Sequence, residues 1–168
     1  MRHSWKAAAA AAVIAVLVAT PADAQSRVRF GLAGTGLFSL ESGGGTAWGG
    51  MGVLGYGPAH GLGFRGDVTL AGGDDVTRLL VTGDAVYIFE TPLSVFHPYL
   101  IGGAGIFNAN DNTEPMVKLG GGLEYHFVER NRGPVLFGEP TLNLIFAGDD
   151  GGGTATALQV TLGVKLGG

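Results

Sequence analysis

The sequence predicts an all-β protein, an eight-stranded antiparallel up-and-down transmembrane β-barrel in which the strands follow one another as a meander. Three observations predict this fold. Apolar and polar residues alternate with a period of two in eight successive segments, the pattern of a β-strand. Glycine supplies 32 of 168 residues, and charged residues make up only 14%, against about 25% in ordinary soluble domains. A hydrophobic fraction of 46% excludes a disordered chain.

The first 24 residues are predicted to be a signal peptide that is cleaved after Ala24. Arg2 and Lys6 form a positive start, residues 7–19 form a short apolar stretch, and residues 22–24 read Ala-Asp-Ala. The apolar stretch is shorter than the about 20 residues that span a bilayer as a helix. Residues 25–168 are therefore expected to be an exported barrel domain. The chain contains no cysteine, so no disulfide framework is expected.

The eight strands are separated by clusters of Gly, Pro, Asn and Asp. In the first four, alternation runs through apolar positions beginning at Val28, Trp48, Leu62 and Leu79. The fifth follows the turn with Pro-Tyr and a glycine-rich run, the sixth alternates most cleanly, and the eighth alternates up to the C-terminal glycines. Pro140 predicts a bulge or a broken ladder in the seventh, because proline has no N–H to donate. The predicted strands are 28–40, 47–56, 62–70, 76–89, 98–108, 116–128, 135–146 and 155–166.

The connections predict that the two ends of the sheet differ in charge. Those after odd strands are acidic and contain no Lys or Arg, whereas Arg130 and Arg132 fall in a connection after an even strand. An even number of strands places both chain termini at this second end. The acidic residues of the first end are Glu41, Asp74, Asp75, Asp111, Glu114, Asp149 and Asp150.

One face of the predicted sheet carries the charged residues, interleaved with Gly, Ala, Thr, Asn and Gln. The charges on this face are nearly balanced, and a narrow lumen requires both balance and small neighbours, whereas a solvated face requires neither. Five Lys or Arg side chains turned to lipid would cost on the order of 10–20 kcal/mol, which rivals a whole folding free energy of about 5–15 kcal/mol. The expected lumen ion network is Arg29, Arg65, Asp67, Arg78, Asp84, Lys118, Glu124, His126, Glu139 and Lys165. The positions expected to face lipid include Phe64, Tyr87, Leu119, Leu123, Tyr125, Phe127, Leu144 and Leu162.

The signal peptide, the eight-strand meander and the stretch HPYLIGGAGIFN at 97–108 resemble the OmpA-like outer-membrane β-barrel proteins. The resemblance covers the mature chain and implies the bacterial outer membrane, with outer-membrane lipid and the barrel-assembly machinery as partners. The chain departs from the family in ending on Leu166-Gly167-Gly168, where an aromatic residue is usual. The peptidoglycan-binding domain of longer relatives is not expected in this chain.

Candidate chemistry is sparse. The stretch GLGFRG at 61–66 has the spacing of a dinucleotide-binding loop, but it opens a strand, so it offers no helix N-terminus for a phosphate. Glu124 and His126 share a face and can form an acid–base or metal pair. Eight-stranded lipid A deacylases pair a wall histidine with a serine, yet no serine lies near His126 in the sequence. A lumen histidine without catalytic role is favoured, and no metal and no cofactor are expected.

The expected function is structural or interactive: membrane integrity, adhesion or a scaffold, with the lumen closed by its ion pairs. Removal of Arg2, Lys6 and Asp23 from 10 basic and 14 acidic residues leaves a net charge near −5, which argues against nucleic acid as a partner. A surface partner of the acidic loops is possible but unidentified. The alternatives are a narrow channel, a lipid A-modifying enzyme, and a secreted lipocalin-like barrel that binds an apolar ligand and has the two faces exchanged.

Overall fold

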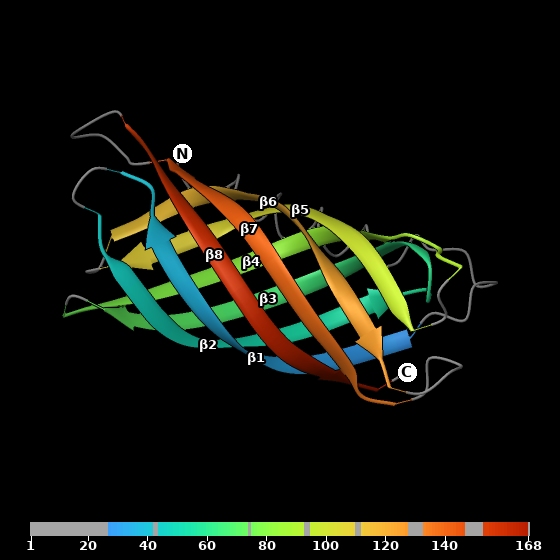
Figure 1. Cartoon of the computed structure of the whole chain (residues 1–168). Helices are drawn as coiled ribbons and strands as arrows, with labels where there is room; N and C mark the ends of the chain where they lie inside the picture. Colours follow the sequence, from blue (N-terminus) through green and yellow to red (C-terminus); the bar gives the residue numbers. More distant parts are fainter. Residues whose placement is uncertain are drawn as a thin grey trace.

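The computed structural model describes residues 27–41, 44–73, 75–92, 95–109, 112–127, 133–146 and 153–167. These residues form one antiparallel barrel of eight strands, which confirms the predicted fold class (Figure 1). The predicted signal peptide lies outside them. The strands are β1 (Arg27–Ser39), β2 (Thr46–Gly57), β3 (Gly61–Gly73), β4 (Val76–Ile88), β5 (Phe96–Ala109), β6 (Asn112–His126), β7 (Val135–Phe146) and β8 (Thr154–Leu166).

Each strand pairs with the next along the chain, and β1 pairs with β8 to close the barrel. The closing ladder runs from Phe30 opposite Leu166 to Ser39 opposite Ala157. Closure leaves no edge strand, so every strand has two neighbours for its backbone hydrogen bonds. Figure 1 shows the strands inclined to the barrel axis, as closure of a sheet requires.

The largest difference from the predicted strand bounds is at the β5–β6 hairpin. The prediction left residues 109–115 as a loop, because Asn, Asp and Pro are turn residues, but β5 continues to Ala109 and β6 begins at Asn112. Pro115 is accommodated because β6 pairs only with β5 at this point, opposite Ile106, and its ladder with β7 begins at Met116. The strands therefore extend well beyond the apolar part of the pattern.

Pro140 leaves a gap in the β6–β7 ladder and no bulge. The register runs from Met116 opposite Ile145 to Gly120 opposite Thr141, and it resumes at Leu123 opposite Gly138 without a shift. The pairing of β7 with β8 is continuous through Pro140. Of the two outcomes that the sequence predicted, the locally broken ladder is the one observed.

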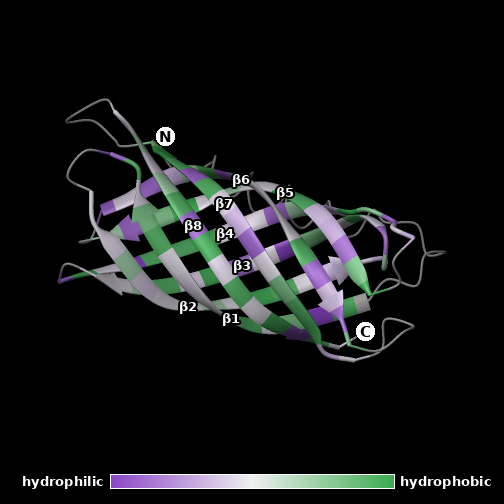
Figure 2. Cartoon of the chain, in the orientation of Figure 1, coloured by the Kyte–Doolittle hydropathy of each residue, from purple (hydrophilic) through white to green (hydrophobic). Residues whose placement is uncertain are grey.

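The barrel carries its apolar side chains on the outside and its charged side chains on the inside. Large hydrophobic residues are exposed along every strand, with Leu32 at 78% and Leu162 at 70%. The interior positions that alternate with them include charged residues that are almost fully buried. Figure 2 shows the resulting green and purple alternation along the strands. No helix among the described residues is long and apolar enough to cross a membrane.

Candidate functional site

The barrel interior is filled in layers from the acidic end to the opposite end. Next to the acidic end lies an apolar layer of Leu37, Ala47, Ala71, Leu80, Met116 and Ile145. Below it lies a neutral polar layer, in which the Gln159 side-chain amide donates to Thr35 and Thr69. The charged layers follow, and most of their side chains are less than 5% exposed. Side chains therefore occupy the bore throughout the neutral polar and charged layers.

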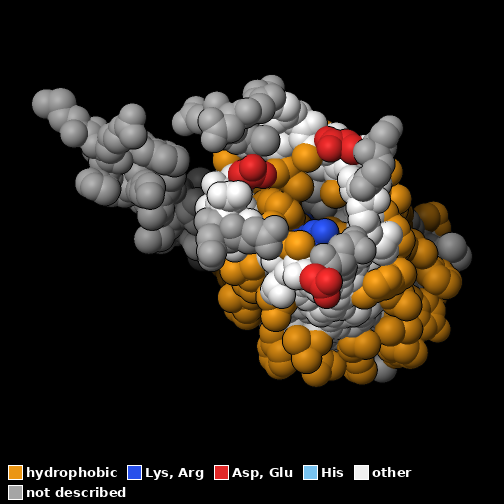
Figure 3. Space-filling model, turned by 90° about the vertical axis from the view of Figure 1, so that its left-hand side faces the viewer, with side chains coloured by type: hydrophobic (Ala, Val, Ile, Leu, Met, Phe, Trp, Pro, Cys, Tyr) orange, Lys and Arg blue, Asp and Glu red, His pale blue; other side chains and the backbone are white. Residues whose placement is uncertain are grey.

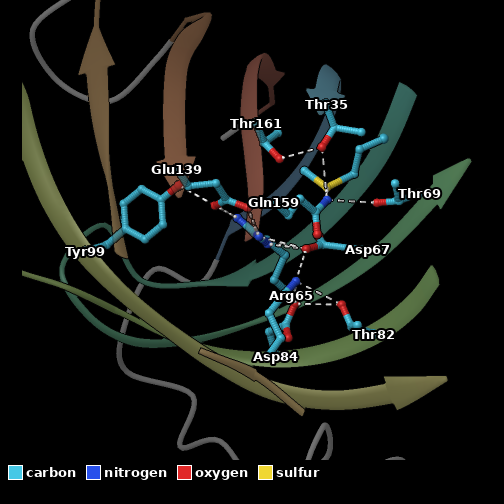
Figure 4. A network of polar contacts seen from close by, with 12 residues as sticks. Thr35, Arg65, Asp67, Thr69, Thr82, Asp84, Tyr99, Glu139, Gln159 and Thr161 are labelled. Carbon is cyan, nitrogen blue, oxygen red and sulfur yellow. Dashed lines mark hydrogen bonds and ion pairs between the residues drawn. The ribbon is translucent and has the colours of Figure 1, made fainter. Parts of the chain in front are cut away.

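Arg65 joins opposite walls of the barrel. Its guanidinium donates two hydrogen bonds to the Glu139 carboxylate, at 2.7 Å and 2.6 Å, a bidentate geometry that fits two planar groups. Arg65 lies on β3 and Glu139 on β7, four strands apart in a ring of eight, so this pair spans the full bore. Arg65 also donates to Asp67 Oδ2, and Tyr99 donates to Glu139 Oε2 at 2.6 Å (Figure 4).

Lys118 connects β6 to β3 and β4. Its ammonium lies 2.6 Å from Asp67 Oδ2 and 2.5 Å from Asp84 Oδ2, and it donates to Thr82 Oγ1 at 2.9 Å. An ammonium has three N–H groups, and these three acceptors match them. Thr82 in turn donates to Asp84 at 3.0 Å. The ammonium therefore has a full set of acceptors, although almost no solvent reaches it.

A second charged cluster lies nearer the end opposite the acidic loops, centred on Glu124. Its carboxylate accepts from Lys165 at 2.8 Å and from Arg29 at 3.3 Å, and His126 Nε2 lies 3.2 Å away. Lys165 also sits 4.5 Å from the centre of the Phe137 ring, a cation–π distance. Both basic groups thus meet a carboxylate and do not face the interior unpaired.

Among the described residues, the ion pairs join four basic to four acidic side chains, so the charges in these pairs are balanced. This set is Arg29, Arg65, Lys118 and Lys165 with Asp67, Asp84, Glu124 and Glu139. A buried ion left alone costs several kcal/mol, whereas full pairing removes most of that penalty. Balance is therefore a condition for so many charges to occupy one barrel.

Of the ten residues expected in the lumen network, Arg78 stands apart. The structure places it toward the acidic end, half-buried, where its guanidinium donates to the Gly73 carbonyl at 3.0 Å. Within the described part of the chain, no ion pair joins it to the other nine. Its position in the alternation of β4 is one that faces the interior. It lies on the acidic-end side of the apolar layer, which separates it from the charged layers.

Several interior residues were absent from the sequence prediction. Tyr99 was missed because the expected lumen residues were selected by charge. Its hydroxyl donates a hydrogen bond to Glu139. His97 was missed because the predicted strand began one residue later, and its ring packs 4.6 Å from that of His126 and 5.0 Å from that of His60. Gly122 makes room for Tyr99, because an added Cβ would lie 2.5 Å from the tyrosine hydroxyl.

The residues expected to face lipid all lie on the outer surface. Tyr87, Leu119, Leu123, Phe127 and Leu162 are between 44% and 70% exposed. The other three, Phe64, Tyr125 and Leu144, are partly covered by neighbouring side chains. Tyr125, for example, packs between the rings of Phe96 and Phe127.

Among the described residues, the structure brings no serine to His126. Ser39 is the only serine within the described ranges, and it lies at the acidic end, whereas His126 lies at the opposite end of β6. No group of three or more His, Cys, Asp or Glu side chains in those ranges has the arrangement of a metal site.

Solved structures with the same architecture are outer-membrane barrels. The Neisserial surface protein A, NspA, aligns with a TM-score of 0.67 over 84% of this chain and 96% of its own, at 17% identity. The N-terminal β-barrel domain of Pseudomonas aeruginosa OprF aligns with a TM-score of 0.56 over 84% of this chain and 100% of its own, at 18% identity. The chain has the fold of the small outer-membrane β-barrels.

The expected resemblance is therefore confirmed at the level of the fold. A third structure, the outer membrane enzyme PagL, has a TM-score of 0.47 at 13% identity over 83% of this chain and 98% of its own, and it supports no conclusion about activity. The sequence matches no protein-family model and no curated protein.

Proposed function

We propose that this protein is an outer-membrane β-barrel with a structural or interaction role, such as membrane integrity, adhesion or scaffolding. Its lumen is closed by the ion pairs, and its role in this proposal is not enzymatic. Residues 1–24 act as the export signal, removed after Ala24, and residues 25–168 form the barrel. The partners in this proposal are outer-membrane lipid and the barrel-assembly machinery, with a surface partner left open.

The observation that carries the proposal is the sidedness of the barrel. Among the described residues, twenty-four large hydrophobic side chains are exposed on the outside or at the strand ends. Full burial of one such side chain is worth about 1.5–3 kcal/mol, so covering the exposed parts with lipid yields on the order of 20 kcal/mol. That exceeds a typical folding free energy of about 5–15 kcal/mol, so the medium around the barrel dominates its stability. A lipocalin-like barrel requires the reverse sidedness.

Aromatic pairs near both ends of the barrel support the same orientation in a bilayer. Phe38 and Trp48 form an edge-to-face pair near the acidic end, with centroids 5.4 Å apart. At the opposite end, the Tyr125 ring contacts those of Phe96 and Phe127 at 5.0 Å and 5.2 Å. Transmembrane barrels carry aromatic girdles at the two interfaces of their apolar band.

The closed lumen is proposed from the contact between Arg65 and Glu139. This pair crosses the bore, and Lys118 fills the space beside it by contacting two further strands. An eight-stranded barrel has an interior just wide enough for its side chains. A channel would require these ion pairs to separate.

The test is fractionation of cells that express the full chain, followed by a carbonate wash and a gel run with and without boiling. The proposal expects the processed protein in the washed outer membrane, with a mobility shift on boiling. It also expects no single-channel currents when the protein is inserted into planar bilayers. Recovery in the soluble fraction would refute the membrane placement. Discrete single-channel currents from correctly inserted protein would refute the closed lumen alone.

A further inference from the structure

The barrel is hollow at its acidic end, above the charged layers. A cavity of about 270 Å³ opens there, and it is lined by residues of β1, β4, β5, β6, β7 and β8. Figure 3 looks onto this end and shows the hollow, with a basic side chain inside it and acidic side chains around it. At about 30 Å³ for each water molecule in the liquid, the space corresponds to roughly nine waters. Covalently bonded atoms pack more closely than separate water molecules, so a molecule of about a dozen non-hydrogen atoms fits.

The walls of the cavity are apolar. Leu37, Leu80, Phe107 and Ile145 line it, and Leu80 lies opposite Phe107 across the β4–β5 ladder. Leu37, Leu80 and Ile145 belong to the apolar layer, and Phe107 packs against it. A lining of this kind favours the body of an apolar or aromatic ligand.

Two opposite charges also line the cavity. Arg78 projects from β4 and Glu114 from β6, on either side of β5, and no ion pair joins them to each other or to another described residue. Arg78 makes one hydrogen bond to the described part of the chain, to the Gly73 carbonyl, although a guanidinium has five N–H groups. A ligand that carries both a carboxylate and an ammonium group complements this pair.

A third polar group lies in the lining, deeper than the two charges. Asn143 is fully buried, its amide nitrogen donates to Gln159, and its Oδ1 has no hydrogen-bond partner. The Asn143 side chain has no exposed surface, so a ligand in the cavity does not reach this oxygen. Beneath Asn143 the polar and charged layers close the bore, so the cavity is a blind pocket.

We propose that this cavity binds a small zwitterion with an aromatic or apolar body, of the class represented by tyrosine. Arg78 takes the carboxylate, Glu114 takes the ammonium group, and the ring lies among Leu80, Phe107 and Ile145. The site is reached from the acidic end, and its existence does not depend on the barrel's proposed role in the membrane.

The test is calorimetric titration of the full barrel in lipid nanodiscs with L-tyrosine and three analogues that each lack one feature. Tyramine lacks the carboxylate, 3-(4-hydroxyphenyl)propanoate lacks the ammonium group, and phenylalanine lacks the hydroxyl. Tyramine and the propanoate each lack the partner of one charged side chain, so each is expected to bind roughly tenfold or more weakly than tyrosine. Phenylalanine keeps both charged groups and is expected to bind as tyrosine does.

Matched variants assign each interaction to its residue. Arg78→Gln should weaken tyrosine roughly tenfold and leave tyramine unchanged, and Glu114→Gln should weaken tyrosine and leave the propanoate unchanged. Ala155→Leu, which fills the cavity, should abolish binding of all four compounds, with folding checked by the gel shift on boiling. No saturable binding of tyrosine up to about 1 mM would overturn the proposal. Equal affinity for all four compounds, or charge variants that bind tyrosine as the native barrel does, would also overturn it.

Discussion

Replacement of Leu119 by Arg tests the sidedness of the barrel, with Leu40→Arg as a matched control. The two leucines are equally exposed, at 56%, but Leu119 lies at the middle of β6, whereas Leu40 follows the end of β1. Both variants create the same outward-facing charge. Only the depth of that charge in a bilayer differs between them.

The magnitude follows from the position of each leucine. An arginine at mid-bilayer costs about 2–4 kcal/mol, and the lost lipid contact of a leucine that is 56% exposed adds about 1 kcal/mol. Leu119→Arg should therefore lower the free energy of unfolding by about 3–5 kcal/mol. Near the interface the charge costs about 0–1 kcal/mol, so Leu40→Arg should lower it by about 1–2 kcal/mol.

The assay is equilibrium urea unfolding of each refolded barrel in lipid vesicles, followed by tryptophan fluorescence and by the fraction of protein that shifts on boiling. The expected difference of about 2–3 kcal/mol corresponds to a factor of roughly 30–150 in the unfolding equilibrium. Equal destabilisation by the two variants would show that depth does not matter, and the outer face would not be in lipid.

Three further predictions concern the lumen. Lys118→Gln should destabilise the barrel by about 3–5 kcal/mol, because Asp84 loses its ion-pair partner. In the same urea titration, the double variant with Asp84→Asn should recover at least half of that loss. Glu139→Gln should destabilise the barrel by about 3–5 kcal/mol, whereas Tyr99→Phe should cost only about 1–2 kcal/mol, because the ion pair between Arg65 and Glu139 remains. Equal losses of unfolding free energy in the two variants would contradict the bidentate pair. Gly122→Val should reduce the yield of the compact, heat-modifiable form more than Tyr99→Phe does, since its side chain collides with the tyrosine ring; a normal yield would contradict this packing.

The period-two pattern predicts a good deal of this protein, because one residue's face determines the faces of its neighbours. It predicts eight strands, their order and the side on which Lys118 and Glu124 lie. It contains no information about distance around the ring, so it could not pair Arg65 with Glu139, 74 residues later in the chain. It could not separate Arg78 from the other interior charges, because that depends on how far along the axis each side chain lies. The cavity was likewise beyond prediction, because its lining comes from six strands.

The long-range ion pairs have a consequence for the order in which the barrel assembles. Arg29 meets Glu124 across 95 residues of sequence, and Arg65 meets Glu139 across 74, so no single hairpin can satisfy its own interior charges. An unfinished sheet would present unpaired carboxylates, ammonium groups and guanidinium groups to whatever fills its concave side, and only closure of β1 against β8 brings all of them together. Partly inserted intermediates are therefore penalised twice, for open backbone edges and for solitary charges. Such a chain gains most by crossing the bilayer as a nearly complete ring, in a single cooperative step.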